Sequence, residues 1–256
     1  MKDRTEIGGP DGAFRTTQWT QLLDARTLDE GRRRDALGAV MARYWKPVYV
    51  YLRRKGRSNE AAKDLTQGFF EQVVLGRELV QQADQAKGRF RTFLMTALDR
   101  YVTSVHRAET ARKRAPAGGM VHLDGVEAPE RLEPSHHATA EEAFAYSWAS
   151  ELLDEVLEAV AADCRRAGQQ THWQVFFATV VQPIQTGEPA PTMADLCRQF
   201  GIRSEAKASN MNVTVKRRFK AVLRARVRPH VEADDQVDQE IRELMAILAS
   251  KPGAGS

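Results

Sequence analysis

The stretch Thr192–Arg228 constrains this chain most, because its apolar residues repeat at helical spacing on both sides of a tight turn. A first predicted helix ends at Gly201, the residue type that most readily adopts the left-handed conformation at a helix end. Ile202 is predicted to fill the space between the two helices, and Ser204 to cap the second one. The apolar stripe of that second helix comprises Ala208, Met211, Val215, Phe219 and Val222.

The other face of the second helix is polar and basic, with only Glu205 opposing the positive charge. Amides near the start of a helix and cations further along are typical of a helix-turn-helix whose second helix lies in the DNA major groove. An ordinary amphipathic helix pair with a solvated basic face fits the same spacing. The residues predicted to read DNA are Ser204, Lys207, Ser209, Asn210, Asn212, Lys216, Arg217 and Lys220.

Bulk properties favour a nucleic-acid partner in the cytoplasm. The chain has 256 residues and a formal net charge of +4, and its positive charge gathers at residues 87–114 and 207–228, as expected for contact with two places on one nucleic acid. No apolar run suits a membrane helix or a signal peptide. No nucleophile–base pair or ligand cluster stands out, so neither an enzyme nor a bound metal or cofactor is expected.

The periodicity predicts an all-α protein with two helical domains joined by a flexible linker. Residues 1–13 are polar and predicted to be disordered. Residues 14–114 form the first domain, the Pro- and Gly-rich residues 115–139 form the linker, residues 140–230 form the helix-turn-helix domain, and residues 231–256 form a C-terminal helix and tail. Within the first domain, Pro47 is expected to kink or divide its helix.

Several motifs in the first domain resemble the sigma-70 family of RNA polymerase sigma factors. The segment DLTQGFFEQVV, followed by KGRFRTFLMTALDRYVTSVHR, looks like the second conserved region of that family, closest to extracytoplasmic-function (ECF) sigma factors. The segments FRTTQWTQLL and YWKPVYVYLRRKG, with the RKR at residues 112–114, resemble one large ECF-like subgroup. The helix-turn-helix then corresponds to the fourth region, and the resemblance covers most of residues 14–245.

This resemblance implies a contact with core RNA polymerase. In the family, the helix with the D-L-x-Q pattern docks on the clamp helices of the β′ subunit, which assigns Asp64 and Gln67 to core binding, with Glu71 as a neighbour one turn on. A carboxylate and an amide suit a partner helix that presents arginines. Taken without the resemblance, these residues form a solvated polar face. The family also implies contacts with the β flap, with promoter DNA and with an anti-sigma factor.

The resemblance places the predicted helix 90–107 at the promoter −10 element. Phe93 either stacks with unpaired bases or belongs to the core. Many relatives carry Asn where this chain has Asp99, so Asp99 either pairs with a neighbouring cation or changes how the element is read. The residues assigned to this contact are Arg89, Arg91, Phe93, Asp99, Arg100 and Arg107.

The expected function is therefore promoter-specific initiation by core polymerase, with the helix-turn-helix at the −35 element. Asn210 and Asn212 depart from the family, which often has apolar or aromatic residues there; they suit adenine edges or indicate a changed docking angle. Two other functions fit the sequence. One is a helix-turn-helix regulator that acts without polymerase, and the other is a sigma-like adaptor that binds protein but no longer melts DNA.

Overall fold

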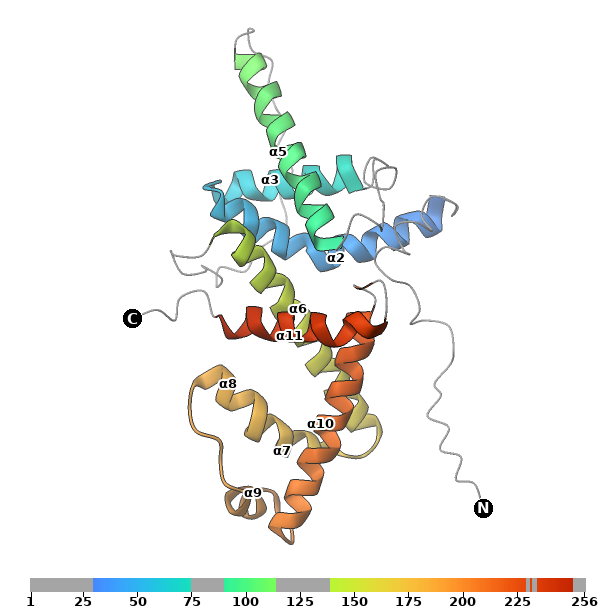
Figure 1. Ribbon diagram of the computed structural model, residues 1–256, viewed down its shortest axis with the longest axis vertical. Coiled ribbons are helices and arrows are strands. Elements are labelled where there is room, and N and C mark those ends of the chain that lie inside the picture. Colours follow the sequence, from blue (N-terminus) through green and yellow to red (C-terminus); the bar gives the residue numbers. More distant parts are fainter. Residues whose placement is uncertain (1–29, 75–89, 114–138, 229–230, 232–233, 251–256) are drawn as a thin grey trace. The chain divides into compact units, whose positions relative to one another are not determined.

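The computed structural model describes residues 30–74, 90–113, 139–228, 231 and 234–250 (Figure 1). These residues form helices and turns without a strand, so the all-α prediction is confirmed for them. The α-helices are α2 Glu30–Arg54, α3 Asn59–Phe69, α5 Phe90–Lys113, α6 Ala140–Arg166, α7 Gln170–Phe176, α8 Gln182–Thr186, α9 Met193–Phe200, α10 Glu205–Val227 and α11 Val237–Ala249. The predicted disordered N-terminus, residues 115–138 of the predicted linker and the end of the tail lie outside the described residues.

Contacts divide the chain into two units, and the boundary lies within α6. The first unit comprises Met1–Trp148, Pro229–Asp234 and Leu244–Ser256, and the second comprises Ala149–Arg228 and Asp235–Glu243. The first turns of α6 therefore group with the N-terminal unit, whereas the sequence predicted a second domain that begins at residue 140.

In the first unit, α3 runs back along α2, and α5 crosses α3 (Figure 1). The α2–α3 connection is short because Gly56 adopts a left-handed φ of 80° and Ser58 caps α3, with its side chain accepting a hydrogen bond from the Ala61 N–H at 3.2 Å. Pro47 does not divide α2, which is one helix throughout.

The core of the first unit is aromatic. The Tyr44 ring lies 5.4 Å from that of Phe90 and 6.3 Å from that of Phe144, measured between centroids. These residues come from α2, α5 and α6, and all are buried. Because each aromatic side chain buries a large apolar area, the start of α6 contributes to this core together with α2 and α5.

A π-helical turn follows α3 and another follows α7, at Phe70–Val74 and Phe177–Val181. Such a turn is wider than an α-helical turn because its hydrogen bonds span five residues. In the second unit the helical run continues through Pro183 to Thr186, although the sequence suggests a helix that stops at this proline. Pro183 comes two residues after the π-helical turn, and Gly187 ends the run at a φ of 76°.

The helices α3 and α5 approach closely at Gly68. A Cβ atom there would overlap the hydroxyl of Tyr101, whereas a Cβ at Gly38, in the middle of α2, would meet no atom within 4 Å. Glycine at position 68 therefore allows a contact between the two helices that any larger residue would disturb.

We expect Gly68→Ala and Gly38→Ala to change stability in opposite directions. Alanine at Gly38 should raise the free energy of unfolding by about 0.5–1 kcal/mol through helix propensity. Alanine at Gly68 should lower it by about 1–3 kcal/mol, since the added methyl group crowds Tyr101. Urea-induced unfolding measures both. In a Tyr101→Phe background, which lacks the hydroxyl, Gly68→Ala should cost less. An equal gain from both glycine variants would contradict the close approach.

Candidate functional site: a nucleic-acid interface and a polar helix face

Local hydrogen bonds define both ends of the turn between α9 and α10. Thr192 caps α9: its side chain accepts from the Asp195 N–H at 3.1 Å, and the Asp195 carboxylate accepts from the Thr192 N–H at 3.2 Å. Gly201 ends α9 in the left-handed region at a φ of 63°. Ser204 caps α10 by accepting from the Lys207 N–H at 3.3 Å. The predicted stop at Gly201 and cap at Ser204 are thus confirmed.

One apolar cluster holds the two helices together. Ile202, in the turn, is buried with residues of α7, α9 and α10, as the sequence predicted. The α10 helix also packs along α7, where the Phe219 ring lies 5.8 Å from that of Phe176. Because these contacts use one side of α10, its other side is left facing outward. The cluster comprises Val175, Ala178, Leu196, Ile202, Ala208 and Met211.

Most of the residues predicted to read DNA lie on that outward side of α10. Lys207, Asn210, Lys216, Arg217 and Lys220 are exposed. Ser209 is half-buried, and Ser204 is exposed although its hydroxyl caps the helix. These side chains supply amide and cationic groups along a single helix face, the chemistry that contacts base edges and phosphates.

Asn212 is the exception, and the prediction that it lies on the reading face was wrong. Its side chain is only 6% exposed, and its Oδ1 atom has no hydrogen-bond partner among the described residues. It follows Ala208 by four residues and precedes Val215 by three, and both of those residues are buried. This spacing places Asn212 on the packed side of α10 and was the signal in the sequence.

Arg218 connects the middle of α10 to the end of α6 and to the α6–α7 connection, a role that the sequence analysis missed. Its guanidinium donates to Cys164 Sγ at 2.9 Å and to Gln169 Oε1 at 2.9 Å. Burial lowers the pKa of His172, and the positive charges of Arg218 and Lys207 lower it further. The partners of Arg218 are 54 and 49 residues away in the chain, so no local spacing pointed to them.

The polar face of α3 and the π-helical turn that follows it present the residues assigned to polymerase binding. Asp64 and Glu71 are exposed and Gln67 is half-buried. The Gln67 Nε2 atom donates to Glu71 Oε1 at 2.9 Å, so these two side chains point toward each other along the helix. The row is solvated and acidic, and it contains both hydrogen-bond acceptors and an amide donor.

On α5, several residues assigned to the −10 element make contacts inside the first unit. The Arg91 guanidinium lies 4.8 Å from the ring centroid of Trp148, a cation–π contact. Phe93 is half-buried, with its ring 6.3 Å from that of Phe90. Arg100 and Arg107 are exposed, and Arg89 lies outside the described residues.

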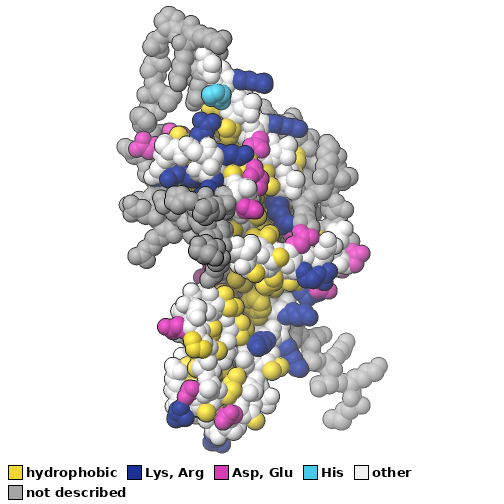
Figure 2. All heavy atoms as spheres, turned by 60° about the vertical axis from the view of Figure 1, so that its left-hand side comes forward, with side chains coloured by type: hydrophobic (Ala, Val, Ile, Leu, Met, Phe, Trp, Pro, Cys, Tyr) yellow, Lys and Arg dark blue, Asp and Glu magenta, His cyan; other side chains and the backbone are white. Residues whose placement is uncertain are grey.

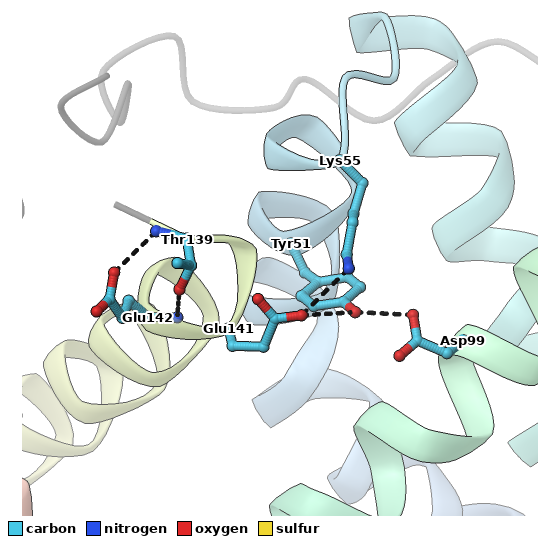
Figure 3. Close-up of polar contacts among 6 residues, drawn as sticks. All are labelled: Tyr51, Lys55, Asp99, Thr139, Glu141 and Glu142. Atoms are coloured by element: carbon cyan, nitrogen blue, oxygen red, sulfur yellow. Dashed lines mark hydrogen bonds and ion pairs between the residues drawn. The ribbon is translucent and has the colours of Figure 1, made fainter. Parts of the chain in front are cut away.

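Asp99 has a partner that the sequence analysis did not name. The Tyr51 hydroxyl donates to Asp99 Oδ1 at 2.7 Å and lies 3.4 Å from Glu141 Oε1 (Figure 3). The Lys55 ammonium in turn donates to Glu141 Oε1 at 3.1 Å and lies 5.1 Å from the Tyr51 ring centroid. This Tyr51 network joins α2, α5 and α6. At its edge, Thr139 caps α6 by accepting from the Glu142 N–H at 3.1 Å (Figure 3).

The electrostatics of the Tyr51 network favour a neutral phenol beside two carboxylates. Burial raises the pKa of Tyr51 well above its ordinary value of 10.0, and the adjacent carboxylates of Asp99 and Glu141 raise it further. A hydrogen bond from a backbone N–H lowers the pKa of Glu141, and the neighbouring Lys55 ammonium lowers it further. Burial acts in the opposite direction but is outweighed. Asp99 is therefore bound to a neutral donor within the fold.

Charge on the face of the molecule drawn in Figure 2 is mixed, with Lys and Arg side chains among Asp, Glu and uncharged ones. The candidate nucleic-acid interface is defined by the exposed cations and amide on one face of α10. Among the described residues, no group of three or more His, Cys, Asp or Glu side chains is arranged to hold a metal ion. In the same part of the chain, no helix combines the length and apolar character required to cross a membrane.

Comparison with protein-family models, with curated proteins and with solved structures finds no match to this chain. The residues and their geometry therefore carry the functional argument.

We expect Tyr51→Phe to lower the free energy of unfolding at neutral pH by about 1–3 kcal/mol, because a hydrogen bond to a carboxylate is lost. The difference from wild type should shrink as the pH rises above 10, where the unfolded phenol ionises while the raised pKa keeps the folded one neutral. Urea unfolding at several pH values measures it. Tyr49→Phe, which removes a hydroxyl that donates to Asn59 Oδ1, is the matched control. A pH-independent difference for Tyr51→Phe would refute the network.

We expect Asn212→Leu to raise the free energy of unfolding by about 1–3 kcal/mol, since it removes a buried oxygen that has no partner. Asn210→Leu, on the exposed side of the same helix, should change it by less than about 0.5 kcal/mol. Thermal or urea unfolding compares the two. A loss of stability in Asn212→Leu alone would mean that the amide is satisfied and structural.

Proposed function

We propose that this chain is a sigma factor of the sigma-70 family, of the extracytoplasmic-function type. It binds core RNA polymerase, directs it to promoters in the cytoplasm and leaves the chemistry of RNA synthesis to the polymerase. The observation that carries this proposal is the capped turn between α9 and α10, which leaves cations and an amide exposed on one face of α10. That face would enter the major groove at the −35 element.

The polymerase contact rests on the sequence resemblance and on the exposure of Asp64 on α3 and Glu71 in the π-helical turn that follows it. Gln67 and Glu71 are already bonded to each other, which holds their side chains in one direction before a partner arrives. A row of carboxylates with an amide suits arginine-bearing helices, because charge-assisted hydrogen bonds fix the register of such a contact. The β′ clamp helices and the β flap of core polymerase are the partners that the family implies.

A second candidate is favoured by the contacts of α5. Arg91 and Asp99 are engaged by Trp148 and Tyr51 within the first unit. If they stay engaged, α5 offers less to a −10 element, and the chain would act as a duplex-binding regulator or as a sigma-like adaptor. The alternatives differ in their partners, since the regulator needs DNA and not polymerase, whereas the adaptor needs protein and shows no promoter preference.

The first test is capture of purified core RNA polymerase by the full chain and by the double variant Asp64→Ala, Gln67→Ala. Losing charge-assisted bonds to the partner should weaken binding at least tenfold, which is about 1.4 kcal/mol or more. A matched control removes a carboxylate and an amide from exposed positions elsewhere, Glu158→Ala with Gln174→Ala, and should bind as wild type does.

Failure of the wild-type chain to bind core polymerase would overturn the sigma-factor proposal and leave the duplex-binding regulator. If both double variants bind core polymerase as well as wild type does, the polymerase contact does not involve Asp64 and Gln67 of α3. If wild type binds and the α3 variant does not, run-off transcription from a promoter then separates the sigma factor from the adaptor.

A further inference from the structure

The outward face of α10 has a large apolar side chain at its centre. Val213 is 45% exposed, and it lies one turn from Asn210 on one side and from Arg217 on the other. Ile184 and Met245 are the other large apolar side chains that are exposed in the described part of the chain, and neither belongs to α10. Val213 is therefore an apolar surface within a polar and basic face.

Neither packing nor helix propensity accounts for a valine at this position. Its side chain points away from the buried stripe formed by Ala208, Met211 and Val215. A β-branched residue is also a poorer helix former than the alanine, lysine or arginine found elsewhere on this helix. Single exposed apolar residues are common on protein surfaces, so the position of Val213 among the groups predicted to meet DNA carries the inference.

The DNA major groove offers a characteristic apolar group, the C5-methyl group of thymine. Asn210 and Val213 lie in the first three turns of α10, the part of a recognition helix that reaches base edges, and Arg217 follows one turn on. Resting on the proposed function, we propose that Val213 contacts a thymine methyl group in the major groove and makes that base pair a determinant of sequence preference.

The test first needs a DNA site. Duplexes are selected from a random pool by the full chain alone and by the chain bound to core RNA polymerase. In the duplex recovered, each thymine is then replaced singly by uracil, which removes only the methyl group, and competition against the unmodified duplex gives the change in affinity.

For wild type, uracil at one position should weaken binding about fourfold, the equivalent of one buried methyl group. Val213→Ala, which shortens the apolar side chain, should discriminate thymine from uracil less than wild type does, and its unfolding temperature should stay near that of wild type because the residue is exposed. Ile184→Ala, which removes another exposed β-branched side chain of the second unit, should discriminate as wild type does.

Each other outcome has a distinct meaning. If no duplex is recovered in either selection, DNA binding by α10 and the role of Val213 both fall. If duplexes are recovered but uracil is tolerated at every position, or if Val213→Ala remains equally sensitive to it, only the role of Val213 falls. Loss of polymerase capture by Val213→Ala without a change in methyl discrimination would assign this face to a protein contact instead.

Discussion

The helix α10 buries one side, and the direction of that burial decides which of its side chains can reach a partner. The turn between α9 and α10 sets that direction for the candidate interface. With Ile202 buried and Gly201 in the left-handed region, α10 packs along α7 and α9 on one side only. As a consequence, four cations of α10 face outward, since a helix cannot bury one stripe without exposing the opposite one: Lys207, Lys216, Arg217 and Lys220.

The first unit follows the same rule with aromatic residues. Tyr44 contacts the rings of Phe90 and Phe144, so its core gathers side chains from α2, α5 and the start of α6. The carboxylates of α3, Glu60 and Asp64, stay exposed on the opposite side of that helix. The Tyr51 network lies beside this core and restricts how α2, α5 and α6 are oriented relative to one another. Hydrogen bonds and ion pairs require a particular geometry, whereas apolar packing allows several arrangements.

Local features of the fold were predictable from the sequence and long-range polar contacts were not. The cap at Ser204 and the stop at Gly201 depend on residues within one turn of each other, and both were identified. Asn212 was misplaced because its residue type was given more weight than its spacing from Ala208 and Val215. The bond from Tyr51 to Asp99 spans 48 residues, and no periodic pattern in a single chain encodes such a pair.

The π-helical turn at Phe177–Val181 also bears on how the sequence can be read. A helix with an extra residue in one turn shifts the phase of everything that follows by about 100° relative to a regular helix. Apolar periodicity counted from α7 therefore loses register before α8. The same turn ties the chain length to the site: deleting one residue within it would restore regular hydrogen bonding while rotating α8 and redirecting the segment that leads to α9. The number of residues in this turn therefore affects the structure independently of which residues they are.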